Sequence, residues 1–203
     1  MIVTTIMIII IVNGGCIFQN EDSSNNGKLN EYFTAKEGKE MADQKAKDWK
    51  NDSILYQVWA HGNYENKNGK SNTWEYDYYS PSTKETNSDG DETYLQYAFN
   101  VHFNYVSNGT EFRGKMFDYP FENWNIDSDE AYSIVMNDKN VTDFYLKYPN
   151  PSFGMFRLSA SKYSYDNHPI WCFTWNGESG NLLTHFEVIL DAMTGEIVRV
   201  YKF

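Results

Sequence analysis

The stretch Phe186-Glu-Val-Ile-Leu-Asp-Ala-Met-Thr-Gly-Glu-Ile-Val-Arg-Val200 decides the fold, and its pattern predicts a β-hairpin. Apolar residues alternate with Glu187 and Asp191 before the turn, and a second apolar run follows it. The Asp191 side chain can accept hydrogen bonds from backbone N–H groups two or three residues further on. Gly195 supplies the positive φ that closes a short loop made of a type I turn plus a bulge. We therefore interpret Asp191 and Gly195 as structural turn residues.

An apolar run at the start of the chain predicts a signal peptide at residues 1–16. Residues 2–12 are apolar apart from two threonines, and Asn13-Gly-Gly-Cys16 follows them. A run of this length is too short for a membrane-spanning helix, which needs about 20 residues, and it matches the core of a signal peptide. The small residues before Cys16 resemble the lipobox of prokaryotic lipoproteins, and this resemblance implies that Cys16 is lipidated. An uncleaved anchor or a misassigned start is the alternative.

The polar segment at residues 17–30 is rich in Asn and Ser, and it has too little apolar surface to fold. It predicts a flexible tether, which would hold a globular domain clear of the membrane. The expected location is therefore extracytoplasmic, at the cell surface. There the chain is either membrane-anchored through the lipidated Cys16 or secreted.

The patterns in residues 31–120 predict a helix followed by four strands. Thr34-x-x-Glu37 has the form of a capping box, and apolar residues then recur at helical spacing. Asn108-Gly109 lies between alternating runs and is the strongest short signal for a hairpin turn. The alternating runs predict strands at residues 54–64, 73–80, 93–105 and 111–117, with a polar loop at residues 81–92.

Residues 121–203 predict the same order of elements again. Asp127-x-x-Glu130 also has capping-box form, and helical stretches are expected at residues 128–137 and 142–148. Strands are expected at residues 153–161, 170–175, 183–191 and 196–202. The expected fold class is therefore α+β, with two tandem repeats that each combine a helix with a four-stranded antiparallel meander.

The second of these segments resembles the PepSY family, which is known from propeptides of thermolysin-type metallopeptidases and from small secreted or membrane-anchored proteins. The likeness rests on Asp-Ser-Asp-Glu-Ala131 at a helix start, an aromatic strand, and Phe-Glu-Val-Ile-Leu-Asp-Ala-Met-Thr-Gly-Glu-Ile197 at the end. It covers residues 121–203. Over residues 34–117 it is only architectural, because Ser107-Asn-Gly-Thr110 lacks the Asp-Ala of the closing signature.

This resemblance implies a non-catalytic, cystatin-like α+β module that is linked to peptidase inhibition or to extracytoplasmic protein contacts. Two such modules in tandem are similar in plan to β-lactamase-inhibitor proteins, and this analogy concerns the plan alone.

Composition and charge exclude one class of partner. The net charge of −11 argues against nucleic acid, because phosphate binding needs clustered Lys and Arg. Aromatic residues make up 17% of the chain, and most of them fall in alternating runs. Such runs suit strands that face a core on one side, so we interpret the aromatic content mainly as sheet core.

Four aromatic residues are candidates for a protein-contact surface on a sheet face. They are Tyr76, Tyr78, Trp171 and Trp175. Tyrosine and tryptophan are enriched at the energetic centres of protein interfaces, and the unpaired edge of a sheet can also recruit a partner strand. The alternative for each of the four is a place in the core.

Other residues that could carry chemistry have simpler interpretations. The loop Asn87-Ser-Asp-Gly-Asp-Glu92 is a weak candidate for Ca²⁺, through Asn87, Asp89, Asp91 and Glu92, but its glycine comes too early for an EF-hand loop. Cys172 lies between aromatic residues with no histidine near it in sequence, which favours an inert thiol. No cofactor and no metal site are expected.

We therefore expect a non-enzymatic extracytoplasmic binding or peptidase-inhibitory module whose partner is an extracytoplasmic protein, with a peptidase as one candidate. A small-ligand or Ca²⁺-binding surface protein is the first alternative. An envelope hydrolase is the second, and it would need two acids, or Cys172 with a histidine, to be brought together by the fold.

Overall fold

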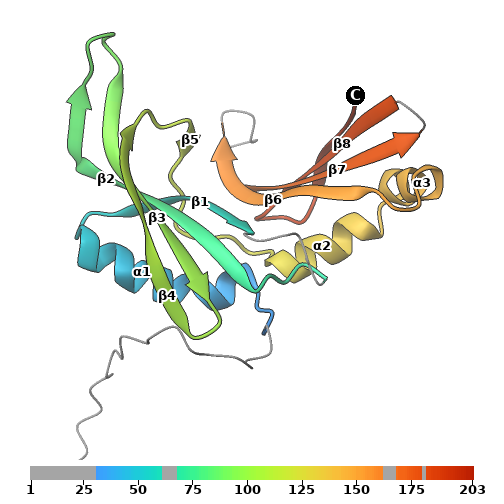
Figure 1. The fold of residues 1–203 in the computed structure, drawn as a ribbon, viewed down its shortest axis with the longest axis horizontal. Coiled ribbons are helices and arrows are strands. Elements are labelled where there is room, and N and C mark those ends of the chain that lie inside the picture. The colour runs from blue at the N-terminus through green and yellow to red at the C-terminus, as the bar shows by residue number, and fades with distance from the viewer. Residues whose placement is uncertain (1–30, 61–67, 162–167, 180–181) are drawn as a thin grey trace, which may run out of the picture.

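The computed structural model describes residues 31–60, 68–161, 168–179 and 182–203 (Figure 1). The expected signal peptide, Cys16 and the tether at residues 17–30 lie outside these residues. Within the described ranges, no helix combines the length and the apolar character that crossing a membrane requires.

Strands form most of the described chain, and they join into one antiparallel sheet. The strand order is β4-β3-β2-β1-β6-β7-β8-β9, and the short β5 pairs with β6. The elements in chain order are α1 (Ala35–Trp49), β1 (Ile54–Ala60), β2 (Thr73–Thr86), β3 (Glu92–His102), β4 (Tyr105–Gly114), β5 (Asp118–Tyr119), α2 (Ser128–Met136), α3 (Lys139–Lys147), β6 (Ser152–Ser161), β7 (Ile170–Ser179), β8 (Leu182–Asp191) and β9 (Ile197–Lys202).

The expected fold class of two tandem repeats is wrong. β1 and β6 pair antiparallel, with Val58 opposite Leu158, and this pairing makes a single nine-stranded sheet. β5 also pairs with β6, so strands from before and after residue 120 are hydrogen-bonded to each other. The two helical stretches expected before β6 are confirmed, as α2 and α3. Alternation along one strand reports which side chains share a face but not which strand lies next to it, and the β1–β6 pairing was therefore missed.

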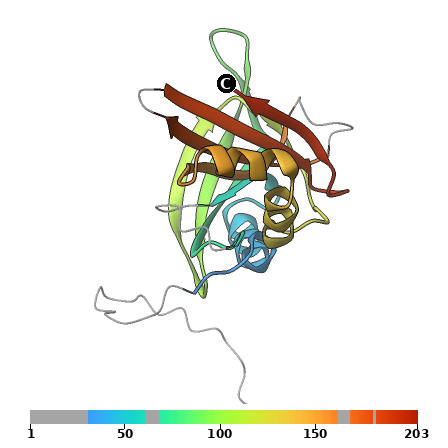
Figure 2. The same cartoon turned by 90° about the vertical axis from the view of Figure 1, so that its right-hand side faces the viewer.

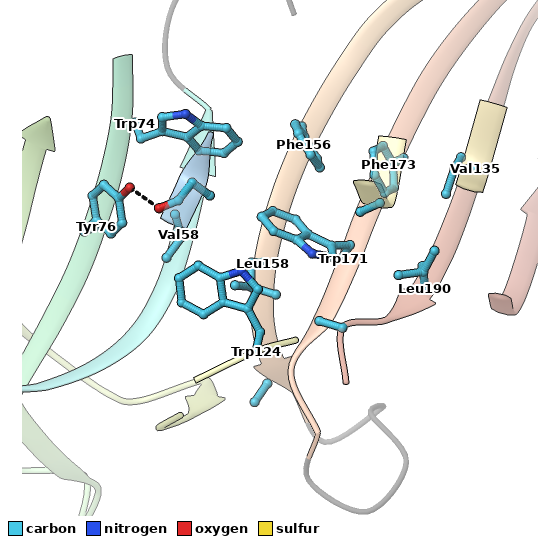
Figure 3. Packing of buried hydrophobic residues seen from close by; sticks show 14 of the residues in the cluster. Val58, Trp74, Tyr76, Trp124, Val135, Phe156, Leu158, Trp171, Phe173 and Leu190 are labelled. Atoms are coloured by element: carbon cyan, nitrogen blue, oxygen red, sulfur yellow. Dashed lines mark hydrogen bonds between the residues drawn. The ribbon is translucent and has the colours of Figure 1, made fainter. Parts of the chain in front are cut away.

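One apolar core runs across the whole sheet. A row of cross-strand partners joins β3 to β8, and all six of its side chains are buried: Phe99, Tyr76, Val58, Leu158, Trp171 and Leu190. Figure 3 shows aromatic rings meeting where β2 approaches β6 and β7. Trp74 packs edge-on against Phe156 and Trp171, with ring centroids 5.5 and 6.3 Å apart. These rings stabilise the junction between the two parts of the sheet.

All three helices pack on the face that holds this core (Figures 1 and 2). The capping box of α1 is confirmed, because the Thr34 hydroxyl accepts from the Glu37 N–H and the Glu37 carboxylate accepts from the Thr34 N–H. The starts of α1 and α2 also bind each other, since the Ala35 N–H donates to the Ser128 hydroxyl at 3.0 Å. The opposite face carries no helix within the described residues, and we call it the helix-free face.

The expected turn at Asn108-Gly109 is wrong. The two residues lie inside β4, where the register shifts between the pairs Ala98–Thr110 and Asn100–Ser107. The chain turns earlier, between the end of β3 and the start of β4. A Cβ added to Gly109 would lie 1.2 Å from the Ala98 carbonyl oxygen. This glycine therefore permits a close backbone approach at a bulge, which is the second role of glycine in a strand.

The closing hairpin has the hydrogen bonds that a structural turn requires. Asp191 Oδ1 accepts from the backbone N–H groups of Met193 at 2.7 Å and Thr194 at 3.0 Å. The Gly195 N–H donates to the Asp191 carbonyl at 2.9 Å, and Gly195 has φ +78°. Asp191 Oδ2 lies 3.0 Å from His168 Nδ1. β8 and β9 then pair on either side of this turn.

Candidate functional site

The four aromatic residues expected at a contact surface lie in the core. Tyr76, Trp171 and Trp175 are fully buried, and Tyr78 is nearly so. All four point to the side where the helices pack, which corrects the interpretation of these residues as an exposed sheet face. The alternation predicted correctly that they share a face of their strands, but the helices cover that face.

The polar atoms of three of them form hydrogen bonds inside the fold. The Tyr76 hydroxyl donates to the Ala35 carbonyl at 2.5 Å, and the Tyr78 hydroxyl donates to Asp43 at 2.6 Å. Trp171 Nε1 donates to the Ile126 carbonyl at 2.8 Å. These bonds fix the start of α1 and the segment before α2 on the sheet. A partner protein therefore has to meet the molecule elsewhere.

The helix-free face carries a polar cluster at its centre, which we call the acid cluster. It consists of Glu75, Asp77, Asp118 and Arg157, from β2, β5 and β6. Glu75 lies opposite Trp59 of β1, and Trp59 lies opposite Arg157, so three neighbouring strands bring these side chains onto one row. Trp59 Nε1 donates to Glu75 Oε1 at 2.8 Å.

The acid cluster contains more negative than positive groups. Burial, and then the neighbouring Glu75, raises the pKa of Asp77 well above its usual range, although Arg157 acts in the opposite direction. Burial also raises the pKa of Asp118, again against Arg157. Glu75 lies two residues before Asp77 on the same face of β2, and its negative charge disfavours the ionised form of Asp77. Among the residues that the structure describes, the guanidinium of Arg157 therefore lies near three carboxyl groups, and the raised pKa of Asp77 favours its neutral form.

Three buried polar atoms at this place have no hydrogen-bond partner in the part of the chain that the structure describes. They are Asp77 Oδ1, Asn100 Oδ1 and Arg157 Nε. Asn100 lies directly opposite Glu75 on β3. Buried polar atoms are almost always paired, and a group of unpaired ones needs an explanation such as a ligand or a strained arrangement.

Aromatic side chains surround the acid cluster on the same face. Tyr79 and Tyr94 pack edge-on, with ring centroids 5.4 Å apart. Phe112 lies opposite Gln96, and Tyr105 lies opposite His102 and stacks on it with centroids 4.3 Å apart. Phe112 is 43% exposed and Tyr105 is 55% exposed. This face therefore offers exposed aromatic surface beside a charged centre.

Cys172 lies on the helix-free face opposite Arg157, and it is buried. Burial, and then the neighbouring Glu187, raises the pKa of the thiol to about 12, although Arg157 acts in the opposite direction. A thiol with a raised pKa holds its proton at neutral pH and is a poor nucleophile. The structure therefore places Cys172 in a setting that disfavours covalent catalysis.

In the loop at residues 87–92, the side-chain oxygens of Asn87, Asp91 and Glu92 already have partners. Asn87 Oδ1 accepts from the backbone N–H groups of Asp89 at 3.0 Å and Asp91 at 2.9 Å. Asp91 pairs with Lys115, and Glu92 pairs with Lys84. These contacts close a turn between β2 and β3. In the described ranges, no group of three or more His, Cys, Asp or Glu side chains is arranged to hold a metal ion.

A cavity of about 580 Å³ lies between α1 and the segment at residues 123–124. Three lysines line it: Lys36, Lys39 and Lys47. Lys39 pairs with Asp43 at 2.5 Å, and Lys36 Nζ donates to the Asn125 carbonyl at 2.7 Å. The charges around this cavity are mixed and two of its lysines are already bonded, so it points to no particular ligand.

Sequence reasoning missed the acid cluster. Glu75 and Asp77 alternate with aromatic residues along β2, which indicates an ordinary solvent-facing side of a strand. Their burial results from β1, β5 and β6, and the alternation contains no information about these neighbours. The placing of the half-buried Arg157 on the same row as Glu75 could be found only once the β1–β6 pairing was known.

No protein-family model and no curated protein sequence matches the chain. Among solved structures, the crystal structure of a "putative lipoprotein" from Clostridium difficile 630 is similar, with a TM-score of 0.44 and 10% sequence identity. The similarity covers 80% of this chain and 90% of that chain. At this level it carries no argument about function, and the PepSY resemblance gains no support from a family match.

Proposed function

We propose that this protein is a non-enzymatic, extracytoplasmic binding module that contacts another protein with the helix-free face of its sheet. The acid cluster is the observation that carries the proposal. Its unpaired buried atoms and its surplus of carboxyl groups lie on the face that the described helices leave open. The exposed Phe112 and Tyr105 add residues of the kind that partners bury at interfaces.

The arrangement of the acids favours binding over hydrolysis. A glycosidase keeps its two carboxyl groups about 5 Å or more apart so that a sugar bond or a water fits between them. Asp77 is only 7% exposed, so a sugar has little access to its carboxyl group. Cys172 holds its proton at neutral pH, which supports the same choice.

The anchor belongs to the same proposal. We expect Cys16 to carry a lipid that keeps the module at the membrane, as the sequence before it predicts. Cys16→Ser should move the protein from the membrane fraction to the medium. Without a lipid at position 16, nothing attaches the protein to the membrane once its leader has been cleaved off. Fractionation and intact mass measure both the location and the added lipid. Retention of Cys16→Ser in the membrane would contradict the anchor but not the binding surface.

The binding surface is tested by cross-linking the protein in its native envelope and identifying the captured partner by mass spectrometry. Phe112→Ala should lower the recovery of a specific partner by roughly tenfold, the effect of a residue that contributes about 1.4 kcal/mol to an interface. Leu146→Ala is the matched control, because Leu146 is 80% exposed but lies on α3, on the other side of the sheet. Equal loss in both variants, or in neither, would remove the helix-free face as the contact surface.

A further inference from the structure

The sheet ends on one side at β4, and no strand of the described residues pairs with the outer edge of β4. The residues from Thr110 to Arg113 are all exposed, so both faces of the strand are open there. Such an edge presents backbone N–H and C=O groups that another strand can bind. We infer that this edge pairs antiparallel with the same edge of a second copy of this protein, across a two-fold axis at Phe112. The inference goes beyond the contact on the helix-free face, because it concerns the sheet edge and a second copy.

The charges along the edge select the register. When two identical strands pair antiparallel, one residue faces its own copy, and the residues on either side of it face each other. With Phe112 at this centre, Glu111 of each copy lies opposite Arg113 of the other. A centre at Glu111 or at Arg113 would place like charges opposite each other, which destabilises a strand pair. A centre at Gly114 would place Arg113 opposite Lys115, with the same result.

The central residue is an exposed aromatic side chain. Phe112 is 43% exposed and lies on the helix-free face, opposite Gln96 of β3. Two such rings that face each other across the axis would cover each other, and aromatic pairs across strands stabilise a sheet. A centre at Thr110 would instead bring the bulge at Gly109 into the pairing, where the ladder is disrupted. Phe112 is therefore the centre that combines regular backbone, opposite charges and an aromatic pair.

The two charged residues can take part without loss of the fold's own contacts. Glu111 Oε2 accepts from Trp49 Nε1 at 2.6 Å, while Arg113 Nη1 donates to the Thr83 carbonyl at 2.8 Å and Nη2 lies 3.2 Å from Glu85. A carboxylate has two acceptor oxygens and a guanidinium has five N–H donors, so each can bind a second partner. The Glu85 side chain is 65% exposed, and an ion pair at such a position is exchanged at little cost.

The other edge of the sheet offers no such match with itself. β9 is shorter than β4, and its charged residues are Arg199 and Lys202, which are both cations. No antiparallel register of two β9 strands therefore places opposite charges opposite each other. A contact of β4 with β9 of another copy would run head to tail and would give an open chain of molecules, not a closed dimer.

The symmetry of this dimer agrees with the proposed anchor. The two-fold axis of an antiparallel edge pairing runs perpendicular to the sheet, so the helices of both copies lie on one side. The described chain begins on that side (Figure 1), so both anchors would reach the same membrane. A pairing of two short strands buries little area and is weak in dilute solution. Attachment to one membrane raises the effective concentration of the two copies, which favours the pairing.

The test is disulfide cross-linking of the full-length protein in its native envelope. Phe112→Cys would place two thiols on the axis, where opposite Cβ atoms lie about 5 Å apart and a disulfide needs about 4 Å. We expect a product of twice the mass under mild oxidation. Thr110→Cys is the matched control, because it is exposed on the same face of β4 but lies about 14 Å from its own copy in this register. Cys172 is buried, so the wild type should give no such product.

An exchange of charges tests the register without a change on the helix-free face. Glu111→Arg, added to Phe112→Cys, would place two cations opposite each other twice, and it should lower the cross-linked fraction by roughly tenfold. Adding Arg113→Glu as well restores opposite charges and should restore the cross-link. Both variants lack the bond from Trp49 to Glu111, so this recovery would separate the dimer contact from damage to the fold.

Three results would each overturn the inference. They are equal cross-linking of Thr110→Cys and Phe112→Cys, a ladder of higher masses as a head-to-tail contact would give, and a charge-exchanged variant that stays as low as Glu111→Arg alone. Cross-linking of Phe112→Cys to another protein only would also overturn it, and would support the contact surface of the proposed function. A dimer at Phe112→Cys with no other protein captured would support the dimer and remove that contact surface.

Discussion

Asp77 and Asp191 lie on one row of cross-strand partners on the helix-free face. The row runs from Asp77 through Gln57, Ser159 and Ile170 to Asp191, with each residue directly opposite the next. The two aspartates are 7% and 6% exposed. By residue type, by face and by burial they are the same, and yet their environments act on them in opposite directions.

The difference lies in the donors around each carboxyl group. Burial alone would raise the pKa of Asp191, but His168 and the backbone N–H groups of Met193 and Thr194 bind the charged form and lower the pKa. Asp77 has another acid beside it and one oxygen without a partner, and its pKa is raised. The hydrogen-bond donors around a buried acid therefore decide whether its pKa is lowered, as for Asp191, or raised, as for Asp77.

The largest expected effect comes from Asp191→Ala. We expect the free energy of unfolding to fall by about 3 kcal/mol, because the variant leaves two turn N–H groups without their acceptor and releases the bond to His168. Urea unfolding followed by tryptophan fluorescence measures it. Asp191→Asn, which keeps one oxygen acceptor, should lose clearly less.

The same comparison fixes the sign of the pH dependence. The lowered pKa of Asp191 means that its stabilisation is present above the ordinary Asp pKa of about 3.9 and is lost as the pH falls through the lowered value. The wild type and Asp191→Ala should therefore converge in stability at low pH. A constant gap between them from pH 7 to pH 2 would show that the turn does not depend on the charge.

Asp77→Asn should act in the opposite direction. We expect it to raise the free energy of unfolding by about 1–2 kcal/mol at pH 7.5, because an amide donates to Glu75 without a titrating proton. The raised pKa of Asp77 costs stability only above about pH 3.9, where the unfolded chain ionises and the folded chain does not. The gain should therefore shrink toward pH 4 in the same urea experiment. A loss of stability at pH 7.5 would mean that Asp77 supports the fold like Asp191.

The smallest expected effect comes from His168→Ala. The His168 side chain is 38% exposed, so solvent screens its bond to Asp191, and we expect a loss of about 0.5–1 kcal/mol in the free energy of unfolding. Thermal unfolding at low and high salt measures the charge contribution. A loss as large as that of Asp191→Ala would show that the bond from His168 to Asp191 stabilises the turn more than the bonds from the backbone N–H groups do.

The sequence predicts the role of Asp191 but not the surroundings of Asp77. The reason is that the two residues differ in how far along the chain their partners lie. The partners of Asp191 include residues two and three positions further on, so the local pattern reports them. The capping box at Thr34 and Glu37 is local in the same way. The surroundings of Asp77 come from β1, β5 and β6, which alternation along one strand cannot identify.

The two larger errors have related causes. Asn108-Gly109 was expected to be a turn because such a pair permits positive φ, but glycine also permits the close backbone approach of a bulge, and only the partner strand decides between the two. Tyr76, Tyr78, Trp171 and Trp175 were considered for a contact surface because aromatic residues suit cores and interfaces equally. The side on which the helices pack decides between those roles.

The starts of α1 and α2, joined by the bond between Ala35 and Ser128, have a consequence for how the molecule stands in its surroundings. The first described residues enter the fold beneath the sheet, on the side of the helices (Figure 1). The tether that we propose for residues 17–30 would pull from this point and would turn the helices toward the membrane surface. The row from Asp77 to Asp191 would then face away from that surface. The anchor would therefore set the orientation in which the helix-free face is presented to other proteins.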